Sequence, residues 1–316
     1  MASSALPSLR QLRYLVAVSE RLNFHQAAAD CHVTQSTLSA GIKELESLLE
    51  VPLVERGSRS VRMTAAGEQV VAQARVLLAQ ARDLVEVARG AGQPLSGPLR
   101  LGVIPTIAPF LLPLVLPQLR VEYPRLQLYL REDLTERVLE RVRAADLDFA
   151  LIALPYDTGE LAVRRLFKDE FWFVARADDP LANAKEVAVR DLRTGHLVLL
   201  EEGHCLREHA IAACGTRSAN PESTVEATSL HTLLQMVEGG MGATLLPEMM
   251  LKAGILNRTE LVARPFSTQV PARTIALVAR PATAHRLDFD LFADRIIELS
   301  RRVTRTASRR PRKSRG

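Results

Sequence analysis

The chain has 316 residues, of which 47% are hydrophobic, and this length exceeds that of a usual single domain. We therefore expect two or three globular domains. The sequence contains no signal-peptide stretch and no run close to the roughly 18 apolar residues that span a membrane, which predicts a soluble, cytoplasmic protein with no membrane partner. Three cysteines are too few for a secreted disulfide framework, and no Cys or His grouping has metal-site spacing, so neither a metal nor a cofactor is expected.

The net charge of +5 originates in the C-terminal segment. Residues 301–315 hold seven Arg and one Lys without any acidic residue, so that the rest of the chain is near −3. This composition predicts a basic, disordered tail over residues 301–316, which either attracts phosphate non-specifically or serves as a solubilising extension. The overall charge therefore does not by itself indicate nucleic-acid binding.

Hydrophobic spacing predicts three helices near the N-terminus. The first begins at Ser8, a suitable N-terminal cap, and a short second helix covers about residues 24–31. A third helix begins near Thr34 or Gln35. Its buried stripe, at spacings of four, three and four residues, is Leu38, Ile42, Leu45 and Leu49.

The opposite face of this third helix combines small hydroxyl side chains with a lysine. Such residues suit entry into the major groove of DNA, where Gln35 in the first turn can reach a base edge. The predicted DNA contacts on this helix are Gln35, Ser36, Thr37, Ser39 and Lys43. Because a solvated amphipathic helix has a similar pattern, these residues alone favour DNA recognition only weakly.

The segment after the third helix is basic and rich in turn signals. Residues 51–67 predict a short β-hairpin, or wing, whose Arg56, Arg59 and Arg62 can lie along a phosphate backbone. An ordinary basic surface turn would contain the same arginines, so both interpretations stay open here.

A long helix is expected after Thr64, which can cap it. Its apolar residues form a coiled-coil seam of about three heptads. They are Val70, Ala74, Leu77, Ala81, Leu84 and Ala88. Such a stripe is either core or a dimer interface, and we expect a homodimer because a helix this isolated needs a partner. Residues 90–98 then break the helix and predict a hinge.

Strand and helix signals alternate beyond the hinge. Strands are predicted at residues 99–104, 126–132, 149–153, 171–175, 196–200 and 273–279, and helices at 108–121, 134–146, 206–214 and 230–238. This β-α-β-α-β start predicts an α/β effector domain.

Residues 24–67 resemble the winged helix-turn-helix of LysR-type transcriptional regulators. The alanine pair, the TQSTLS turn, the IKELE run, the LVER entry and the TAAG exit follow in that family's order. The family's plan implies an all-α winged helix-turn-helix domain, a long linker helix and a two-lobed, periplasmic-binding-protein-like α/β effector domain. The implied boundaries are 1–66, 67–92 and 93–300, with lobe I at about 99–168 and 272–300 and lobe II at about 169–271.

Within the family, stretches such as EEGHCLREHAIAAC resemble the OxyR group of hydrogen peroxide sensors. The resemblance makes Cys205 the peroxidatic cysteine and Cys214, nine positions later, the resolving one. His204 and Arg207 match the histidine and arginine beside the reactive cysteine. Glu208 departs from the pattern, in which the shorter aspartate is more usual.

Three residues distant in sequence also match that group. Thr106 and Thr135, each expected at the C-terminal end of a strand, match threonines beside the reactive thiol, and Arg273 matches an arginine on the returning strand. The two hydroxyls could hold a peroxide oxygen in line for attack. This resemblance implies a sensor site assembled from several strand ends.

Peroxide oxidises a thiolate, so Cys205 needs groups that lower its pKa. His204, Arg207 and the positive end of the following helix are expected to supply them. The sulfenic acid formed first condenses with a second thiol to a disulfide. If residues 206–214 are helical, the two cysteines lie ~13 Å apart, whereas a disulfide tolerates Cα separations of about 7 Å. Oxidation must then refold this segment and so reorient the DNA-binding domains.

The resulting hypothesis is a regulator of antioxidant genes, activator or repressor, that binds double-stranded promoter DNA, responds to hydrogen peroxide and contacts RNA polymerase. We expect a dimer of dimers, that is, a homotetramer, and the resemblance implies reduction by glutaredoxin or thioredoxin. One alternative keeps the architecture but places a small organic effector in the cleft between the lobes, which makes Cys205 incidental. Another, a thiol peroxidase, is disfavoured because it leaves the DNA-binding segment without a purpose, and we do not expect an enzyme.

Overall fold

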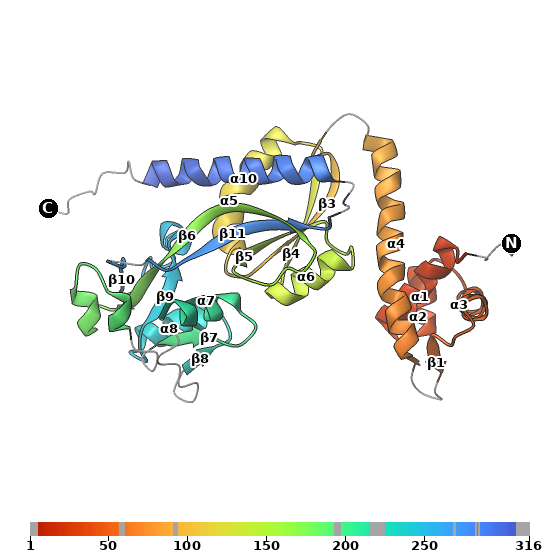
Figure 1. The fold of residues 1–316 in the computed structure, drawn as a ribbon, viewed down its shortest axis with the longest axis horizontal. Helices are drawn as coiled ribbons and strands as arrows, with labels where there is room; N and C mark the ends of the chain where they lie inside the picture. Colours follow the sequence, from red (N-terminus) through yellow and green to blue (C-terminus); the bar gives the residue numbers. More distant parts are fainter. Residues whose placement is uncertain are drawn as a thin grey trace. The chain divides into compact units, whose positions relative to one another are not determined.

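The computed structural model describes residues 6–56, 61–90, 94–192, 197–214, 225–267, 270–281, 283 and 285–307. It divides into an N-terminal unit made mainly of residues 1–92 and a C-terminal unit made mainly of residues 93–316, and each is described by itself (Figure 1). Within the described residues, no helix is long and apolar enough to cross a membrane.

The N-terminal unit is a helix-turn-helix followed by a hairpin and a long helix. Its elements are α1 (Leu9–Arg21), α2 (Phe24–Asp30), α3 (Gln35–Leu49), β1 (Val54–Arg56), β2 (Val61–Met63) and α4 (Ala65–Gly90). Ser8 and Gln11 form a capping box on α1, and Asn23 accepts hydrogen bonds from the first N–H groups of α2. The three predicted helices and the wing hairpin are confirmed.

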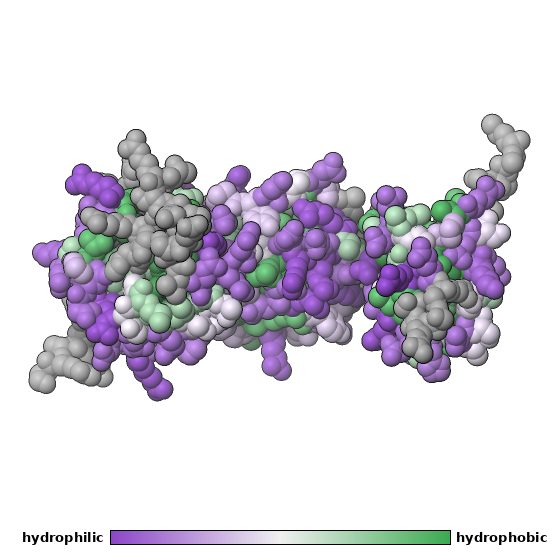
Figure 2. All heavy atoms as spheres, turned by 90° about the horizontal axis from the view of Figure 1, so that it is seen from below, coloured by the Kyte–Doolittle hydropathy of each residue, from purple (hydrophilic) through white to green (hydrophobic). Residues whose placement is uncertain are grey.

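A compact apolar core joins the elements of this unit. Leu38, Ile42 and Leu45 of α3 are fully buried in it, as their spacing predicts. Gly67 lets the start of α4 approach the wing, because a Cβ atom there would lie only 2.1 Å from the carbonyl oxygen of Leu53. Figure 2 shows one face of the molecule, on which hydrophilic residues predominate and hydrophobic residues form small, separate patches.

The C-terminal unit is an α/β structure around one curled mixed sheet. Strand order is β10-β6-β11-β5-β3-β4, with β9 also paired to β6. Its strands are β3 (Gly97–Val103), β4 (Leu126–Glu132), β5 (Phe149–Leu154), β6 (Ala162–Arg176), β9 (Thr244–Pro247), β10 (Leu261–Arg264) and β11 (Ala272–Ala279). Strands β3, β4 and β5 are parallel, whereas β11 runs antiparallel to β5 and β6.

Helices cover this sheet and fill the second lobe. They are α5 (Ala108–Glu122), α6 (Thr135–Arg143), α7 (Cys205–Cys214), α8 (Leu230–Glu238), α9 (Glu248–Lys252) and α10 (Arg286–Ala307), with 3-10 turns at Pro180–Asn183 and Val189–Asp191. A small parallel pair, β7 (Val198–Leu200) and β8 (Val225–Ala227), lies beside α7 and α8 (Figure 1). The predicted α/β effector domain is thereby confirmed.

The long strand β6 links the two lobes. Its first part pairs with β11, which also pairs with β5 in the first lobe, and its last part pairs with β9 and β10 in the second. Side chains at the junction between these parts can therefore face groups from both lobes. Asp169 and Arg273, paired in register on β6 and β11, lie there.

One expectation about the C-terminus is wrong in part. The basic tail was expected to be disordered from residue 301, but α10 continues to Ala307. Basic residues are favourable in the last turns of a helix because they face its negative dipole end, so the start of the basic segment is compatible with helix. Residues 308–316 lie outside the described part of the chain.

Candidate redox site and nucleic-acid interface

Cys205 is the first residue of α7 and is nearly fully buried, with 5% of its surface exposed. The turn before it needs Gly203, whose φ of +96° is in the region that favours glycine. This turn carries the chain from the end of β7 into α7 and so fixes the thiol at a helix N-terminus. Cys205 is a free thiol in this structure.

The two predicted threonines reach Cys205 from the first lobe. Thr106 follows β3 and Thr135 is the first residue of α6, directly after β4. Because β3 and β4 are parallel neighbours, their carboxyl ends meet at one edge of the sheet. Both threonines are at most 2% exposed, and both hydroxyls form hydrogen bonds that stabilise the Cys205 thiolate.

The electrostatic environment of Cys205 contains opposing effects. Burial raises the pKa of the thiol above its usual value, and this is the largest effect. The positive charge of Arg273 and the hydrogen bonds from Thr135 and Thr106 lower the pKa of Cys205. The site therefore supplies specific stabilisation of a thiolate within surroundings that otherwise disfavour charge.

Arg273 is fully buried and joins both lobes to the thiol's neighbours. Its Nε donates to Asp169 Oδ2 at 3.0 Å, and its Nη1 and Nη2 donate to Thr106 Oγ1 and to the Thr106 carbonyl oxygen, each at 3.0 Å. The second oxygen of Asp169 accepts the backbone N–H of Met249 at 2.9 Å. A continuous chain of hydrogen bonds thus runs from α9 through β6 and β11 to Thr106 and Cys205.

Two residues expected to activate Cys205 interact mainly with other groups in this structure. Arg207 Nη1 lies 2.6 Å from Glu226 Oε1 on β8 and donates to the Leu200 carbonyl oxygen at 3.2 Å. Arg207 therefore links α7 to the small β7–β8 sheet. Burial lowers the pKa of His204, with a smaller opposing effect of Glu201. The pKa of Cys205 is lowered by Arg273, Thr135 and Thr106 and by a hydrogen bond from its own backbone N–H, and the activating role of His204 and Arg207 stays a prediction.

Sequence reasoning missed one titratable residue of this site, His209. It is 6% exposed, and its Nε2 lies 3.0 Å from the carbonyl oxygen of Pro155, which follows β5 in the first lobe. Its Nδ1 is buried and has no hydrogen-bond partner among the described residues. Burial lowers the pKa of His209, and the charge of Arg273 adds to this effect while the Pro155 bond opposes it. The sequence did contain a signal for His209. It lies four residues after Cys205 in a predicted helix, and residues at that spacing share a helix face.

Cys214 is the last residue of α7, whereas Cys205 is the first. Nine helical steps separate them by ~13 Å along the axis. The side chain of Cys214 lies outside the described part of the structure. Cys31, the third cysteine, is buried in the core of the N-terminal unit, where burial raises its pKa.

The predicted DNA contacts lie on α3 and the wing. Gln35, Ser36, Thr37 and Lys43 are exposed and Ser39 is half-buried. The Thr34 hydroxyl caps α3 by accepting the Thr37 N–H at 3.2 Å, and it also contacts the hydroxyls of Thr37 and Ser36. In the wing, Arg62 on β2 is exposed, Arg56 lies on β1 without a described side chain, and Arg59 lies outside the described residues.

The predicted seam on α4 has two parts. Near the start of the helix Ala74 is buried against the core of the N-terminal unit. Farther along, Leu77 is 48% exposed and Leu84 is 71% exposed. Leu77 also lines an apolar groove of about 240 Å³ with residues of α1 and α3. The second part of the seam therefore presents an open apolar stripe.

The fold and these sites define a helix-turn-helix regulator with an effector domain. The family "Bacterial regulatory helix-turn-helix protein, lysR family" matches residues 9–68, and "LysR substrate binding domain" matches residues 92–301. The chain therefore belongs to the LysR family of transcriptional regulators, whose members are DNA-binding proteins and not enzymes.

Similar proteins within the family include peroxide regulators. The DNA-binding transcriptional dual regulator OxyR of Escherichia coli is 39% identical over 92% of this chain and 94% of that protein. The HTH-type transcriptional regulator EstR of Acinetobacter baylyi is 44% identical over 96% of this chain and 99% of that protein. Among solved structures, a full-length OxyR variant from Pseudomonas aeruginosa has a TM-score of 0.77 at 35% identity and covers 92% of this chain and 95% of that one. A hydrogen peroxide-bound OxyR mutant from Corynebacterium glutamicum has a TM-score of 0.65 at 32% identity and covers 97% and 96% of the two chains.

Within the part of the chain that the structure describes, no group of three or more His, Cys, Asp or Glu side chains could hold a metal ion.

Proposed function

We propose that this LysR-type regulator senses hydrogen peroxide by oxidation of Cys205, which then forms a disulfide with Cys214. The observation that carries the proposal is the buried thiol at the start of α7, which receives hydrogen bonds from Thr106 and Thr135 and the charge of Arg273. Similar proteins named as hydrogen peroxide-inducible activators support the choice of oxidant.

The chemistry balances with peroxide as the only oxidant. The Cys205 thiolate attacks one peroxide oxygen, the O–O bond breaks, and the departing hydroxide takes up a proton to become water. Cys205 is then a sulfenic acid. The Cys214 sulfur attacks the Cys205 sulfur and displaces hydroxide, which leaves as a second water with the proton of the Cys214 thiol. Two thiols and one peroxide thus give one disulfide and two waters.

The disulfide requires α7 to unwind. A disulfide tolerates Cα separations of about 7 Å, well below the ~13 Å that an intact helix of this length imposes. Unwinding must break the contact of His209 with Pro155, which links α7 to the first lobe, and it frees α7 from the small sheet held by Arg207. The switch therefore changes how the second lobe packs against the first, and this change is transmitted to DNA binding.

DNA recognition is assigned to α3 and the wing. We propose that Gln35, Ser36, Thr37, Ser39 and Lys43 enter the major groove, while Arg56, Arg59 and Arg62 follow the phosphates. Because Ser36 and Thr37 contact Thr34 in the absence of DNA, base contact must replace those hydroxyl contacts. RNA polymerase as a partner and reduction by glutaredoxin or thioredoxin belong to the same proposal.

Self-association is assigned to the open stripe of α4. Pairing of Leu77 and Leu84 across two copies would remove apolar surface from water, and two such dimers would give the proposed tetramer. Leu84→Asp is expected to lower the sedimentation coefficient of the reduced protein. A parent protein that already sediments as a monomer would contradict this assignment.

The deciding experiment combines mass spectrometry of thiol-blocked protein, before and after brief low peroxide, with DNA footprinting of the same samples. We expect a disulfide of Cys205 with Cys214 and an altered footprint in the parent, loss of both in Cys205→Ser, and full retention in the matched control Cys31→Ser. An unchanged peroxide response in Cys205→Ser would overturn the proposal and favour a small organic effector in the cleft between the lobes.

A further inference from the structure

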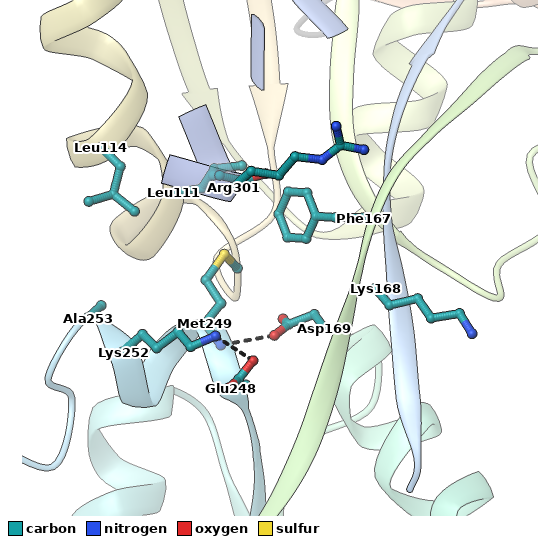
Figure 3. Close-up of a pocket in the computed structure, with 11 residues that line it drawn as sticks. Leu111, Leu114, Phe167, Lys168, Asp169, Glu248, Met249, Lys252, Ala253 and Arg301 are labelled. Atoms are coloured by element: carbon teal, nitrogen blue, oxygen red, sulfur yellow. Dashed lines mark hydrogen bonds and ion pairs between the residues drawn. The ribbon is translucent and has the colours of Figure 1, made fainter. Parts of the chain in front are cut away.

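Asp169 is a buried acid that holds the arginine beside Cys205. It is 3% exposed, and both of its carboxylate oxygens have partners. Oδ1 accepts the Met249 backbone N–H at 2.9 Å, and Oδ2 lies 3.0 Å from both Nε and Nη2 of Arg273. Figure 3 shows the carboxylate facing Met249, whereas the neighbouring Lys168 extends away from it. Asp169 and Arg273 therefore form a buried ion pair at the junction of the lobes.

Neighbouring basic groups are paired with other acids or are uncharged. Lys252 on α9 is paired with Glu248 at 2.7 Å, and Arg207 on α7 is paired with Glu226 at 2.6 Å. Burial and the charge of Arg273 lower the pKa of His209, so this imidazole is mostly neutral at pH 7. Arg273 is thus the positive charge that the site offers to a thiolate, and it lowers the pKa of Cys205.

One guanidinium consequently serves two acidic groups, a carboxylate and a thiol. With Cys205 in the thiol form, Asp169 and Arg273 neutralise each other, and ionisation of Cys205 then leaves a net negative charge in buried surroundings, which is unfavourable. We propose that Asp169 competes with the Cys205 thiolate for Arg273 and thereby sets how readily peroxide oxidises Cys205. Without the carboxylate, ionisation of Cys205 would itself neutralise Arg273. Asp169 thus makes the thiol less reactive than Arg273 alone would make it.

Thr106 holds Arg273 in place independently of Asp169. Arg273 Nη1 donates to Thr106 Oγ1 and Nη2 donates to the Thr106 carbonyl oxygen, each at 3.0 Å. Because the Thr106 hydroxyl accepts from Arg273, its single proton is available to the Cys205 thiolate. A neutral acceptor in place of Asp169 therefore removes the competing charge while the guanidinium stays beside Thr106. Asp169 acts on the thiol through Arg273 and is thus a positioning residue.

The test compares the thiolate titration of Cys205 in the reduced, full-length parent and in Asp169→Asn. The ultraviolet absorbance of the thiolate is followed across pH as the difference between each protein and its own Cys205→Ser derivative. We expect the titration midpoint of Asp169→Asn to fall by about one pH unit or more, and its rate of sulfenic acid formation at neutral pH to rise roughly tenfold. Asp169→Glu keeps the charge and should titrate like the parent.

Asp148→Asn is the matched control for the loss of a buried acid. Asp148 is also 3% exposed and lies near an arginine, with its Oδ2 3.7 Å from Arg100 Nη1. It directly precedes β5, whereas Pro155, which contacts α7, follows the other end of that strand. Asp148→Asn should therefore leave the titration of Cys205 unchanged.

An unchanged or higher midpoint in Asp169→Asn, or an equal fall in Asp148→Asn, would overturn the proposal. If circular dichroism shows that Asp169→Asn does not fold, Asp169→Ser is a smaller neutral acceptor with the same expected fall. The effect on peroxide sensing rests on the proposed function, whereas the titration needs no peroxide. A lowered midpoint without a peroxide-dependent disulfide would reject the sensing role and keep the competition for Arg273. A disulfide in the parent with an unchanged midpoint in Asp169→Asn would reject the competition alone.

Discussion

The hydroxyl of Thr135 offers the cleanest test of how the site activates Cys205. Thr106 also accepts a hydrogen bond from Arg273, so its removal disturbs two interactions, whereas Thr135 acts in the site through its hydrogen bond to the thiolate. Thr135→Val removes the hydroxyl with little change of volume. Thr135→Ser keeps the hydroxyl and serves as the matched control.

The expected magnitude follows from the charge on the acceptor. A hydrogen bond to a charged group contributes about 1.5–3 kcal/mol, and 1.36 kcal/mol corresponds to a tenfold change in a protonation equilibrium. Because peroxide oxidises the thiolate and burial raises the pKa of Cys205, the oxidation rate at neutral pH follows the thiolate population. Thr135→Val should therefore oxidise about tenfold to a hundredfold more slowly at neutral pH.

Rapid quenching and mass spectrometry of the Cys205 sulfenic acid, across neutral to alkaline pH, measure this rate. If the hydroxyl acts only through the pKa, the Thr135→Val rate rises toward the parent rate at high pH. If Thr135→Val still oxidises more slowly than the parent at high pH, the hydroxyl also holds a peroxide oxygen. Identical rate profiles for parent, Thr135→Val and Thr135→Ser would refute the reasoning.

Two further predictions concern buried charge. The folded-state pKa of His209 is lowered, so the unfolded chain binds the proton first as the pH falls, and the free energy of unfolding should decrease below about pH 6.5. His209→Gln should flatten this slope in urea unfolding at several pH values, and an unchanged slope would contradict it. Arg273→Met leaves Asp169 buried without its charged partner and should destabilise the C-terminal unit by about 3–5 kcal/mol. Denaturant unfolding of Arg273→Met measures this loss, and adding Asp169→Leu should restore the free energy of unfolding because it removes the unpaired charge. An Arg273→Met variant as stable as the parent would show that Asp169 finds another partner.

Local signals predicted the elements that position the site. A serine or asparagine before a stretch with helical spacing of apolar residues predicted the first helices. The spacing of apolar residues also predicted the buried face of α3. The short strands β8, β9 and β10 have three or four residues and no clear alternation, so only tertiary pairing defines them. In β6 only the continuous apolar end at residues 171–175 was recognised, because the preceding half carries charged residues on its exposed face.

The contacts of the site itself are beyond local signals. Asp169 and Arg273 are 104 positions apart, and Arg273 reaches Thr106 across 167 positions. Resemblance selected Arg273 and both threonines but gave no indication of Asp169, which no local pattern distinguishes from a surface acid on a strand. Likewise, Arg207 was expected beside the thiol, whereas its nearest charged partner is Glu226 on a strand that was not predicted.

The stability of α7 should set the rate of the second step of the switch. Ala212 is exposed within α7, so Ala212→Gly removes few contacts and weakens the helix by about 1 kcal/mol. That free energy raises the population of the unwound segment roughly fivefold. We expect disulfide formation to accelerate up to about fivefold, while sulfenic acid formation at Cys205 keeps its rate.

Quenched-flow mass spectrometry resolves the two steps in one time course. Ala72→Gly, at an exposed position within α4, controls for a general loss of helix stability and should leave both steps unchanged. Equal disulfide rates in Ala212→Gly and the parent would mean that unwinding is not limiting, and that reaction of the Cys214 sulfur is slower. A change in the first step would instead show that α7 and the Cys205 environment are one cooperative unit, because the helix would then position the thiol as well as separate it from Cys214.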